Sequence, residues 1–578
     1  MRFDSPWRRA ASGFGVLLTV ALFAAPAAVA QAQDDGVPEV SQTFLIENAR
    51  IVQAPGRVID NGHILVEDGL IVAVGTDVTA PIDAHRIAGD SLVVYAGFID
   101  GLSQTGVPQP RSERPPSADD PGNPTAERAG LMPHHSVVDD LVADDKSVDA
   151  MRKAGFTVVH AVPYGRMIPG QGAIVALAGD TPSAMTMRPH AATFMQFTGA
   201  QGVYPGTPMA MMAQLRQTYR EAERRKQVDI EYQRDPNGRT RAMLDPVHQA
   251  FFPIIDGDRP VFFNVESTVE IHRALRLQED LGFPLILGGL GGAAHAMDEL
   301  KDANVPLFLS LDLPDEPKDK PDSTAATYNA DYRAADYDDV EDEANNLKAR
   351  RQDALEAAYG MAGMMRDEGL DFGFSALDVK AGDIQGHIHT MVEHGLSEDD
   401  ALAALTTTPA RLLGLDGVTG TIDEGKIANL VVMTDSYFSE DAQVKFVFVD
   451  GHRFEYETKE KKAASEGDGD SEAEANPQGS WAYTVTLPDG SEINGDLSFS
   501  GSPGNYTGTI ENDMGSDPSD LDDIEIDGNV MSFSYDSGSY GRIEIEVTLT
   551  GDTFDGSLAL ASMGSFPITG TRTSGPDL

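Results

Sequence analysis

Cysteine is absent from the 578 residues of this chain, and its absence excludes several kinds of chemistry. Without thiols the chain can form no disulfide, offers no cysteine nucleophile and has no thiolate ligands for a metal. For the same reason we expect no lipid-anchored amino-terminal cysteine. Any catalytic or metal site must therefore use histidine, carboxylate, hydroxyl or amide groups.

Basic residues are scarce: 43 Lys and Arg stand against 92 Asp and Glu, a net charge of −49. Binding to nucleic acid in general needs a basic surface, so this function class is excluded. Such a charge repels itself at low ionic strength, and salt screens the repulsion. We therefore predict a halophilic protein that works in a salty medium; an ordinary acidic secreted protein is the alternative.

Long hydrophobic runs are missing beyond the amino terminus. The start of the chain has a basic pair at Arg8 and Arg9, an apolar run over 16–23 and an Ala28-Val29-Ala30 cleavage motif. This order is typical of a secretory signal peptide, which we predict over 1–32. No later run is long and apolar enough to span a bilayer. We expect an exported chain, periplasmic or extracellular, that is not transmembrane.

The length exceeds what one hydrophobic core supports, so we expect two or three domains. Apolar and polar residues alternate over 42–92, and a similar short β pattern returns over 418–456. Gly and Asn-Gly separate the predicted strands in the first segment. The two segments are predicted to form one composite β-sandwich domain, split by a larger insertion.

The insertion, 93–417, alternates strand-like apolar runs such as 156–159 and 261–265 with helical patterns. This alternation predicts a (β/α)₈ TIM barrel. A doubly wound open sheet is the alternative, although no Gly-x-Gly-x-x-Gly follows an early strand. The polar segment 314–341 is interpreted as a loop over the barrel mouth or an insertion.

A charged linker is predicted over 457–477, followed by a third unit over 478–574. About eight short strands there favour a small antiparallel β-barrel, with an Ig-like sandwich as the alternative. Gly479-Ser480-Trp481 and Arg572 resemble the Gly-x-Trp and terminal Arg of lipocalin-like barrels. That resemblance implies that the Arg572 guanidinium stacks on the Trp481 ring.

Three segments in order carry a second resemblance: Ala96-Gly97-Phe98-Ile99-Asp100, the run 395–415 and the run 420–432. With them the chain resembles the amidohydrolase superfamily, and most of all its imidazolonepropionase-like secreted branch, over 44–455. The resemblance implies a TIM barrel with one or two divalent metals, such as zinc, at its mouth. There the metal activates water to attack a carbon–nitrogen bond.

The family's metal ligands come from His-x-His on strand 1, a His on each of strands 5 and 6, and an Asp on strand 8. At the matching positions this chain has other residues: Leu102, Gln104, Asn264, Gly288 or Gly289, and Ala376. Leucine has no donor atom, and a neutral amide is a poor ligand for transition metals. We also find no bridging Lys on strand 4. We therefore predict that the family's metal is not bound and that the chain has no other cofactor.

The predicted pocket residues are Gln104, His160, Asn264, Glu266, Ser375 and Asp378. Glu266 and Asp378 could form a carboxylate pair for general acid–base chemistry. The sequence shows no evident His and Asp partners for Ser375, which disfavours a serine nucleophile. His387 and His389 are interpreted as surface histidines away from the barrel mouth.

Three functions remain open from the sequence. The first is a binding or assembly subunit with a degenerate metal site, in a homo-oligomer or beside a paralogous active subunit. The second is a hydrolase of carbon–nitrogen bonds with a rearranged site. In the third, the carboxyl-terminal β domain binds a ligand or partner. The small-molecule ligand is not identified by the sequence.

Overall fold

The structure is a computed structural model, which describes residues 43–110, 118–238, 243, 245–314, 337–439, 441–458, 476–486, 492–502, 505–512, 518–527, 530–536, 542–560 and 564–574. By internal contacts the chain divides into two compact units, Met1–Lys459 and Glu460–Leu578. The predicted signal peptide, 1–32, and most of the predicted linker, 457–477, lie outside the described residues.

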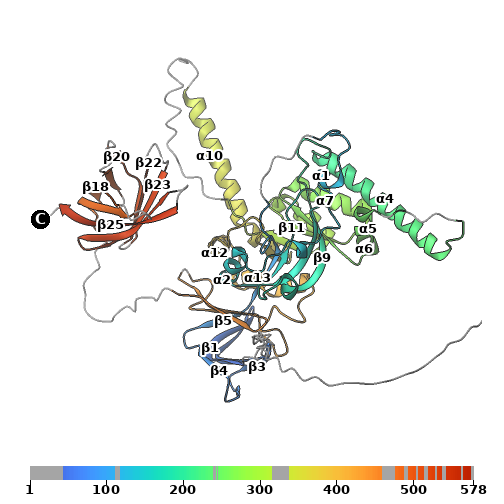
Figure 1. Cartoon of the computed structure of the whole chain (residues 1–578), viewed down its shortest axis with the longest axis horizontal. Coiled ribbons are helices and arrows are strands. Elements are labelled where there is room, and N and C mark those ends of the chain that lie inside the picture. The colour runs from blue at the N-terminus through green and yellow to red at the C-terminus, as the bar shows by residue number, and fades with distance from the viewer. Residues whose placement is uncertain are drawn as a thin grey trace, which may run out of the picture. The chain divides into compact units, whose positions relative to one another are not determined.

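One eight-stranded sheet of the first unit draws strands from two distant parts of the chain (Figure 1). The amino-terminal part supplies β1 (Phe44–Ala54), β2 (Arg57–Glu67), β3 (Leu70–Gly75), β4 (His85–Ala88) and β5 (Val93–Ala96). The later part supplies β14 (Leu430–Met433), β15 (Val444–Val449) and β16 (His452–Glu455). Antiparallel pairing of β5 with β14 joins the two parts, with Ala96 opposite Leu430. Both residues are buried, so the core of this sheet forms only once the intervening chain has folded back.

The eight barrel strands follow one another around the sheet in chain order. They are β6 (Phe98–Ser103), β7 (Phe156–Ala161), β8 (Gly170–Ala176), β9 (Thr186–Gln196), β10 (Val261–Val265), β11 (Leu285–Gly289), β12 (Leu307–Ser310) and β13 (Phe372–Ser375). The predicted TIM-barrel class is confirmed, with one departure: β8 runs antiparallel to both β7 and β9. Only residues 162–169 connect β7 to β8. A parallel connection needs a crossover of a dozen or more residues, so this short loop enforces the antiparallel turn.

The barrel closes between its first and last strands. The Ser375 hydroxyl donates to the Leu102 carbonyl at 3.1 Å, and the Ala376 amide donates to the Asp100 carboxylate at 2.9 Å. Asp100 accepts a further bond from the Leu102 amide at 3.1 Å. A carboxylate inside the barrel wall thus serves as an acceptor for both strands at the seam.

Helices cover the outside of the barrel. Those of seven residues or more are α2 (Lys146–Lys153), α4 (Pro208–Arg234), α7 (Thr268–Leu281), α8 (Met297–Ala303), α10 (Tyr337–Tyr359), α11 (Met361–Asp367), α12 (Ile384–Glu393) and α13 (Glu398–Leu405). Shorter ones are α1 (Ala126–Ala129), α3 (Pro182–Met185), α5 (Pro246–Ala250), α6 (Phe252–Asp256) and α14 (Thr407–Leu412), with 3₁₀ turns at Val137–Asp139 and Ala293–His295.

Helix α7 illustrates why these segments are helical. It buries Ile271, Ala274 and Leu277, whose spacing places them on one helix face. The Ser267 hydroxyl caps its first turn, and Gly282 ends it in the left-handed conformation that glycine adopts without strain. No described helix combines the length and apolarity needed to cross a membrane.

The predicted loop over 314–341 is wrong at its end. Residues 337–341 form the first turn of α10, while 315–336 lie outside the described residues. The acidic and alanine-rich composition of this stretch suits an exposed helix as well as a loop, so polarity alone did not separate the two.

The second unit is an antiparallel sheet of nine strands: β17 (Gly479–Thr486), β18 (Glu492–Ser502), β19 (Asn505–Asn512), β20 (Ser519–Asp520), β21 (Asp522–Asp527), β22 (Val530–Asp536), β23 (Arg542–Thr550), β24 (Thr553–Leu560) and β25 (Gly564–Ser574). Strands β20 and β21 stand at opposite ends of the strand order, yet a single residue, Leu521, separates them. The sheet therefore bends round upon itself as a barrel. The Arg572 guanidinium lies 4.2 Å from the centre of the buried Trp481 ring, the stacking that the sequence predicted.

Candidate functional site at the barrel mouth

Below the mouth, the barrel interior is filled by an apolar cluster. Phe262 of β10 and Phe308 of β12 lie with ring centres 5.5 Å apart, and Leu102 is fully buried in the same cluster. Two glycines make room for these rings. A Cβ atom on Gly101 would lie 1.9 Å from Phe308 Cδ1, and one on Gly288 would lie 2.5 Å from Phe262 Cε1. The space directly under the mouth is thus packed as core.

The residues at the family's ligand positions do not fit a metal. Leu102 packs in the apolar cluster, Gly288 has no side chain, and Ala376 packs in the outer core against the helices. Ser375, the inward neighbour of Ala376, uses its hydroxyl on the barrel seam. Strand β9, the fourth strand, ends at Gln196, whose amide donates to the carbonyls of residues 165 and 166. Among the described residues, no three His, Asp or Glu side chains converge to hold one ion.

Two of the six predicted pocket residues do not reach the mouth cavity. His160 is fully buried inside the barrel, its ring 5.2 Å from that of Phe262. Its Nδ1 donates to the Gly101 carbonyl at 3.1 Å, and burial lowers the pKa of the ring to about 4. Nε2 faces β8, where a Cβ on Gly172 would lie 2.4 Å away. Gln104 lies just past β6 and does not line the cavity.

The other four predicted residues do meet. Asn264, Glu266, Ser375 and Asp378 line one cavity of about 240 Å³ at the carboxyl ends of β10 to β13. The remaining lining residues are Gly289, Gly291, Ser310, Asp312 and Leu377. Asn264 is only 7% exposed, and its amide has no hydrogen-bond partner in the described part of the chain. The amide opens onto the cavity, where a ligand can reach it.

Three acidic side chains line the cavity, Glu266, Asp312 and Asp378, and the pKa values of Glu266 and Asp378 are raised. Partial burial raises the pKa of Glu266, and Glu270, Asp378 and Asp312 raise it further by like-charge repulsion. The pKa of Asp378 is raised by burial and by Asp312. Asp378 also holds a φ of +65°, a left-handed backbone that Asp tolerates better than most residues. Sequence reasoning missed Asp312, although it lies two residues after the end of β12, where barrel strands present functional groups.

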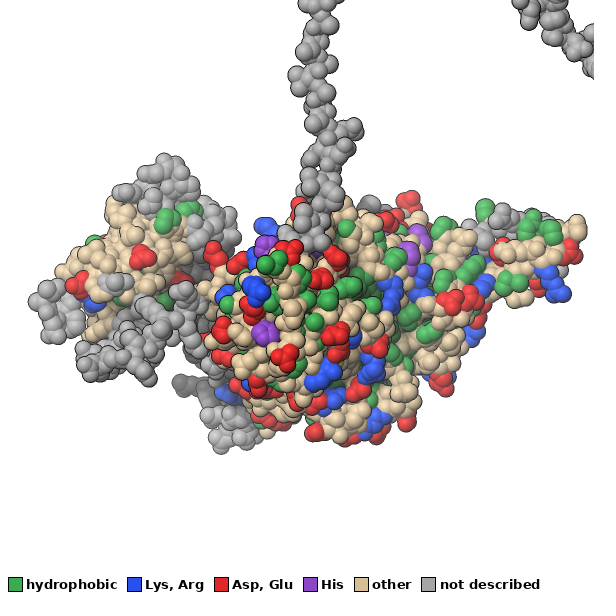
Figure 2. Space-filling model, turned by 90° about the horizontal axis from the view of Figure 1, so that it is seen from below, with side chains coloured by type: hydrophobic (Ala, Val, Ile, Leu, Met, Phe, Trp, Pro, Cys, Tyr) green, Lys and Arg blue, Asp and Glu red, His purple; other side chains and the backbone are tan. Residues whose placement is uncertain are grey.

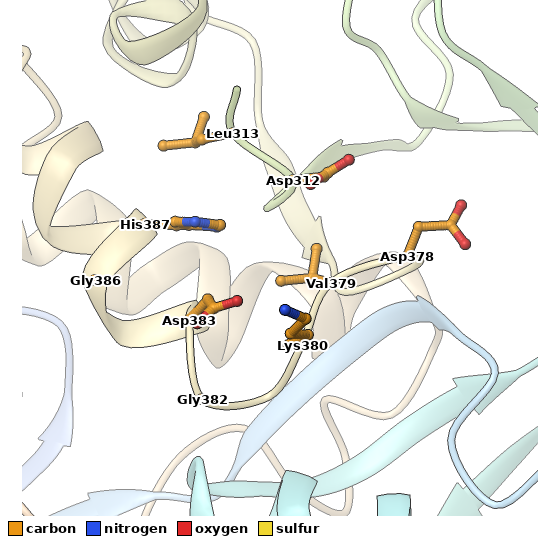
Figure 3. Close-up of a pocket in the computed structure, with 9 residues that line it drawn as sticks. All are labelled: Asp312, Leu313, Asp378, Val379, Lys380, Gly382, Asp383, Gly386 and His387. Carbon is orange, nitrogen blue, oxygen red and sulfur yellow. The ribbon is translucent and has the colours of Figure 1, made fainter. Parts of the chain in front are cut away.

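A second cavity, of about 530 Å³, adjoins the first and shares Asp312 and Asp378 with it (Figure 3). Figure 3 shows His387, Asp383 and Lys380 turned toward its middle, while the Asp378 carboxylate points away from His387. The prediction that His387 lies away from the mouth is wrong. Helix α12 directly follows the last barrel strand, so its first turn lies at the mouth; that order was a usable signal.

The tautomer of neutral His387 follows from its hydrogen bond. Nδ1 lies 2.7 Å from the Leu311 carbonyl, which can only accept, so Nδ1 carries the proton. Nε2 then presents a lone pair. His389, two residues on, instead bonds the Tyr437 carbonyl through Nε2 at 3.1 Å and does not line either cavity at the mouth.

Comparisons with known proteins agree with the barrel fold. The sequence model of the amidohydrolase family matches residues 359–454, from the end of α10 to β16. None of the curated proteins compared with the chain matches it. A crystal structure of an amidohydrolase from Thermotoga maritima MSB8 is 19% identical, with a TM-score of 0.57, and covers 72% of this chain and 100% of its own.

Two weaker likenesses have lower scores. A prolidase complexed with N-methylphosphonate-L-proline is 16% identical with a TM-score of 0.43, covering 72% of this chain and 100% of its own. An adenosine deaminase from Xanthomonas campestris with bound zinc is 12% identical with a TM-score of 0.39, and the match covers 71% of this chain and 92% of the deaminase. The likeness to the Thermotoga protein shows the fold alone, and the other two are too distant to add to it.

Proposed function

We propose that this chain, whose residues 359–454 match the amidohydrolase family model, binds a small molecule at its barrel mouth without the family's metal chemistry. The observation that carries this proposal is the burial of Leu102. At the strand-1 ligand position it is fully buried in one apolar cluster with Phe262 and Phe308, and its side chain has no atom that could bind a metal. The protein is then a binding or assembly subunit on a hydrolase fold.

Loss of ligands on several strands supports the proposal better than any single loss. A catalytic zinc site ordinarily needs three protein ligands and an open position. Here β6 presents Leu102, β11 presents Gly288 and β13 presents Ser375, while Asn264 on β10 offers only a neutral amide. Restoring a metal ligand at one position would still leave the other positions unable to bind a metal.

Metal analysis of the purified chain tests the proposal. We expect zinc, manganese and iron each well below one ion per chain, and no chelator-sensitive hydrolysis of amides, lactams or dipeptides. The Leu102→His, Gln104→His double variant should gain no metal, and we expect it to lose stability by about 2–5 kcal/mol because a buried leucine is lost. Near-stoichiometric zinc with chelator-sensitive turnover in the natural chain would overturn the proposal.

A second candidate function is hydrolysis of carbon–nitrogen bonds by a carboxylate pair. Glu266 and Asp378 line the same cavity, and burial together with nearby like charges raises the pKa of each, which is the direction that a carboxyl acting as general acid needs. This candidate requires turnover that survives chelators and is abolished by Glu266→Gln. Glu270→Gln serves as the matched control, since Glu270 does not line the cavity. Silence across all three substrate classes would exclude it.

A further inference from the structure

We infer that the cavity lined by Asn264, Glu266 and Asp312 takes an organic cation with N–H groups, such as a primary amine or a guanidinium. This inference rests on the proposed binding function and names the class of its ligand. Its basis is the charge of the lining, the largely buried Asn264 side chain, which has no hydrogen bond to another described residue, and the spacing and kind of the lining groups.

The charge of the lining favours a cation. Glu266, Asp312 and Asp378 border the cavity, and none of the described residues that line it is Lys or Arg. Lys380 belongs to the adjoining cavity. The hydroxyls of Ser310 and Ser375 already serve the backbone: the first accepts from the Asp312 amide at 3.0 Å, and the second donates to the Leu102 carbonyl. The charged groups left to face a ligand are acceptors, so the ligand must bring donors.

Asn264 provides an observation independent of the carboxylates. Its side chain is buried at the floor of the cavity and has no partner within the described residues. A Cβ on Gly289 would lie 2.7 Å from Asn264 Oδ1, so only glycine there leaves the amide its position. Gly289 holds a φ of +85°, which also favours glycine. The amide is not among the fully buried polar atoms left without a partner, so it is open to the cavity and can both donate to and accept from a ligand there.

The spacing of the carboxylates separates an organic cation from a metal ion. Glu266, Asp312 and Asp378 share a cavity, yet among the described residues no three acidic or histidine side chains converge on one point. A bare divalent ion needs six or more oxygens at about 2.0–2.6 Å. A cation with N–H groups spread over several ångströms can instead reach separate carboxylates.

The absence of rings from the cavity lining separates one kind of organic cation from another. Quaternary ammonium groups have no N–H and are bound by aromatic cages. Within the described part of the chain, none of the residues that line this cavity is aromatic. The lining therefore favours amines and guanidinium over trimethylammonium compounds.

Isothermal titration of the full chain at low ionic strength tests the inference, with 1,4-diaminobutane and guanidinium as probes. Tetramethylammonium, Mg²⁺ and Ca²⁺ serve as comparison cations. We expect saturable one-site binding of the diamine or guanidinium, weakened about tenfold or more by Asp312→Asn and by Asn264→Leu. Asp416→Asn, which removes one exposed charge outside the cavity, should leave the affinity unchanged. Circular dichroism of each variant confirms that it is folded.

Four outcomes would overturn the inference. The first three are no binding of either N–H cation, tetramethylammonium binding equally well, and affinity unchanged by both cavity variants while the chain stays folded. The fourth is stoichiometric Ca²⁺ or Mg²⁺ bound in competition with the diamine, which would indicate a metal site. Each result is independent of the zinc content and turnover that decide the proposed function, so the two failures are distinguishable.

Discussion

At the scale of single residues, side chains on the same face of a barrel strand differ in role according to how deep they lie in the barrel. Asn264 and Phe262 lie on the same face of β10, yet one opens into a cavity and the other is packed among rings. Residues i and i+2 of a strand share a face, so alternation predicts the face and not the depth. The same ambiguity explains His160, which was predicted near the mouth and lies below it.

His160 makes stability depend on acid pH. The pKa of its ring is lowered from 6.5 to about 4 by burial, so the unfolded chain takes up a proton that the folded chain does not. Stability from this group is fully present above pH 6.5 and is lost as pH falls through about 4. We expect the loss to reach about 3 kcal/mol.

Denaturant unfolding at several pH values measures this effect. The difference in unfolding free energy between the natural chain and His160→Gln should shrink toward acid pH. The matched variant His134→Gln, at an exposed position, should show no such trend. A pH-independent difference for His160→Gln would contradict the assignment.

At the scale of elements, the seam between β6 and β13 depends on Asp100. Its carboxylate accepts from the amides of Leu102 and Ala376, while its second oxygen, Oδ2, has no partner within the described residues. Burial raises the pKa of Asp100 from 3.8 to about 7, against the lowering effect of those hydrogen bonds. The folded chain therefore holds a proton here that the unfolded chain releases.

The consequence is a stability contribution opposite in sign to that of His160. It is fully present below pH 3.8 and lost as pH rises through about 7. Asp100→Asn keeps an acceptor oxygen but cannot ionise, so its unfolding free energy relative to the natural chain should rise by up to about 4 kcal/mol over that range. Asp100→Ala, which leaves both amides unpaired, should be less stable at every pH. Parallel pH profiles for Asp100→Asn and the natural chain would refute this account.

At the scale of the whole molecule, charge dominates. Acidic side chains are spread over the face shown in Figure 2, interspersed with Lys and Arg rather than gathered in one patch. With a net charge of −49, repulsion among them acts over the Debye length, which falls from about 10 Å at 0.1 M salt to about 3 Å at 1 M. We expect the thermal midpoint to rise from low salt to molar NaCl, and equally in KCl. An unchanged midpoint would argue against a halophilic protein.

The sequence by itself determined the class of the fold. Strand and helix periodicity, together with three motif segments, predicted the barrel, a composite β-sandwich from two distant segments, and the separate carboxyl-terminal β unit, because these features follow from local pattern and order. In the structure the two segments form one eight-stranded sheet. It also brought Asn264, Glu266, Ser375 and Asp378 forward as pocket residues, since each follows or ends a barrel strand.

Only the tertiary structure decided how deep each side chain lies in the barrel and which residues surround it. It placed His160 and Leu102 in a packed interior, turned β8 antiparallel, and brought His387 and Asp312 to the mouth. These outcomes depend on how rings fill the space around Gly101 and Gly288 and on which loops meet above the strands. Such contacts join residues far apart in the chain, and no periodicity in one strand encodes what the opposite strand supplies.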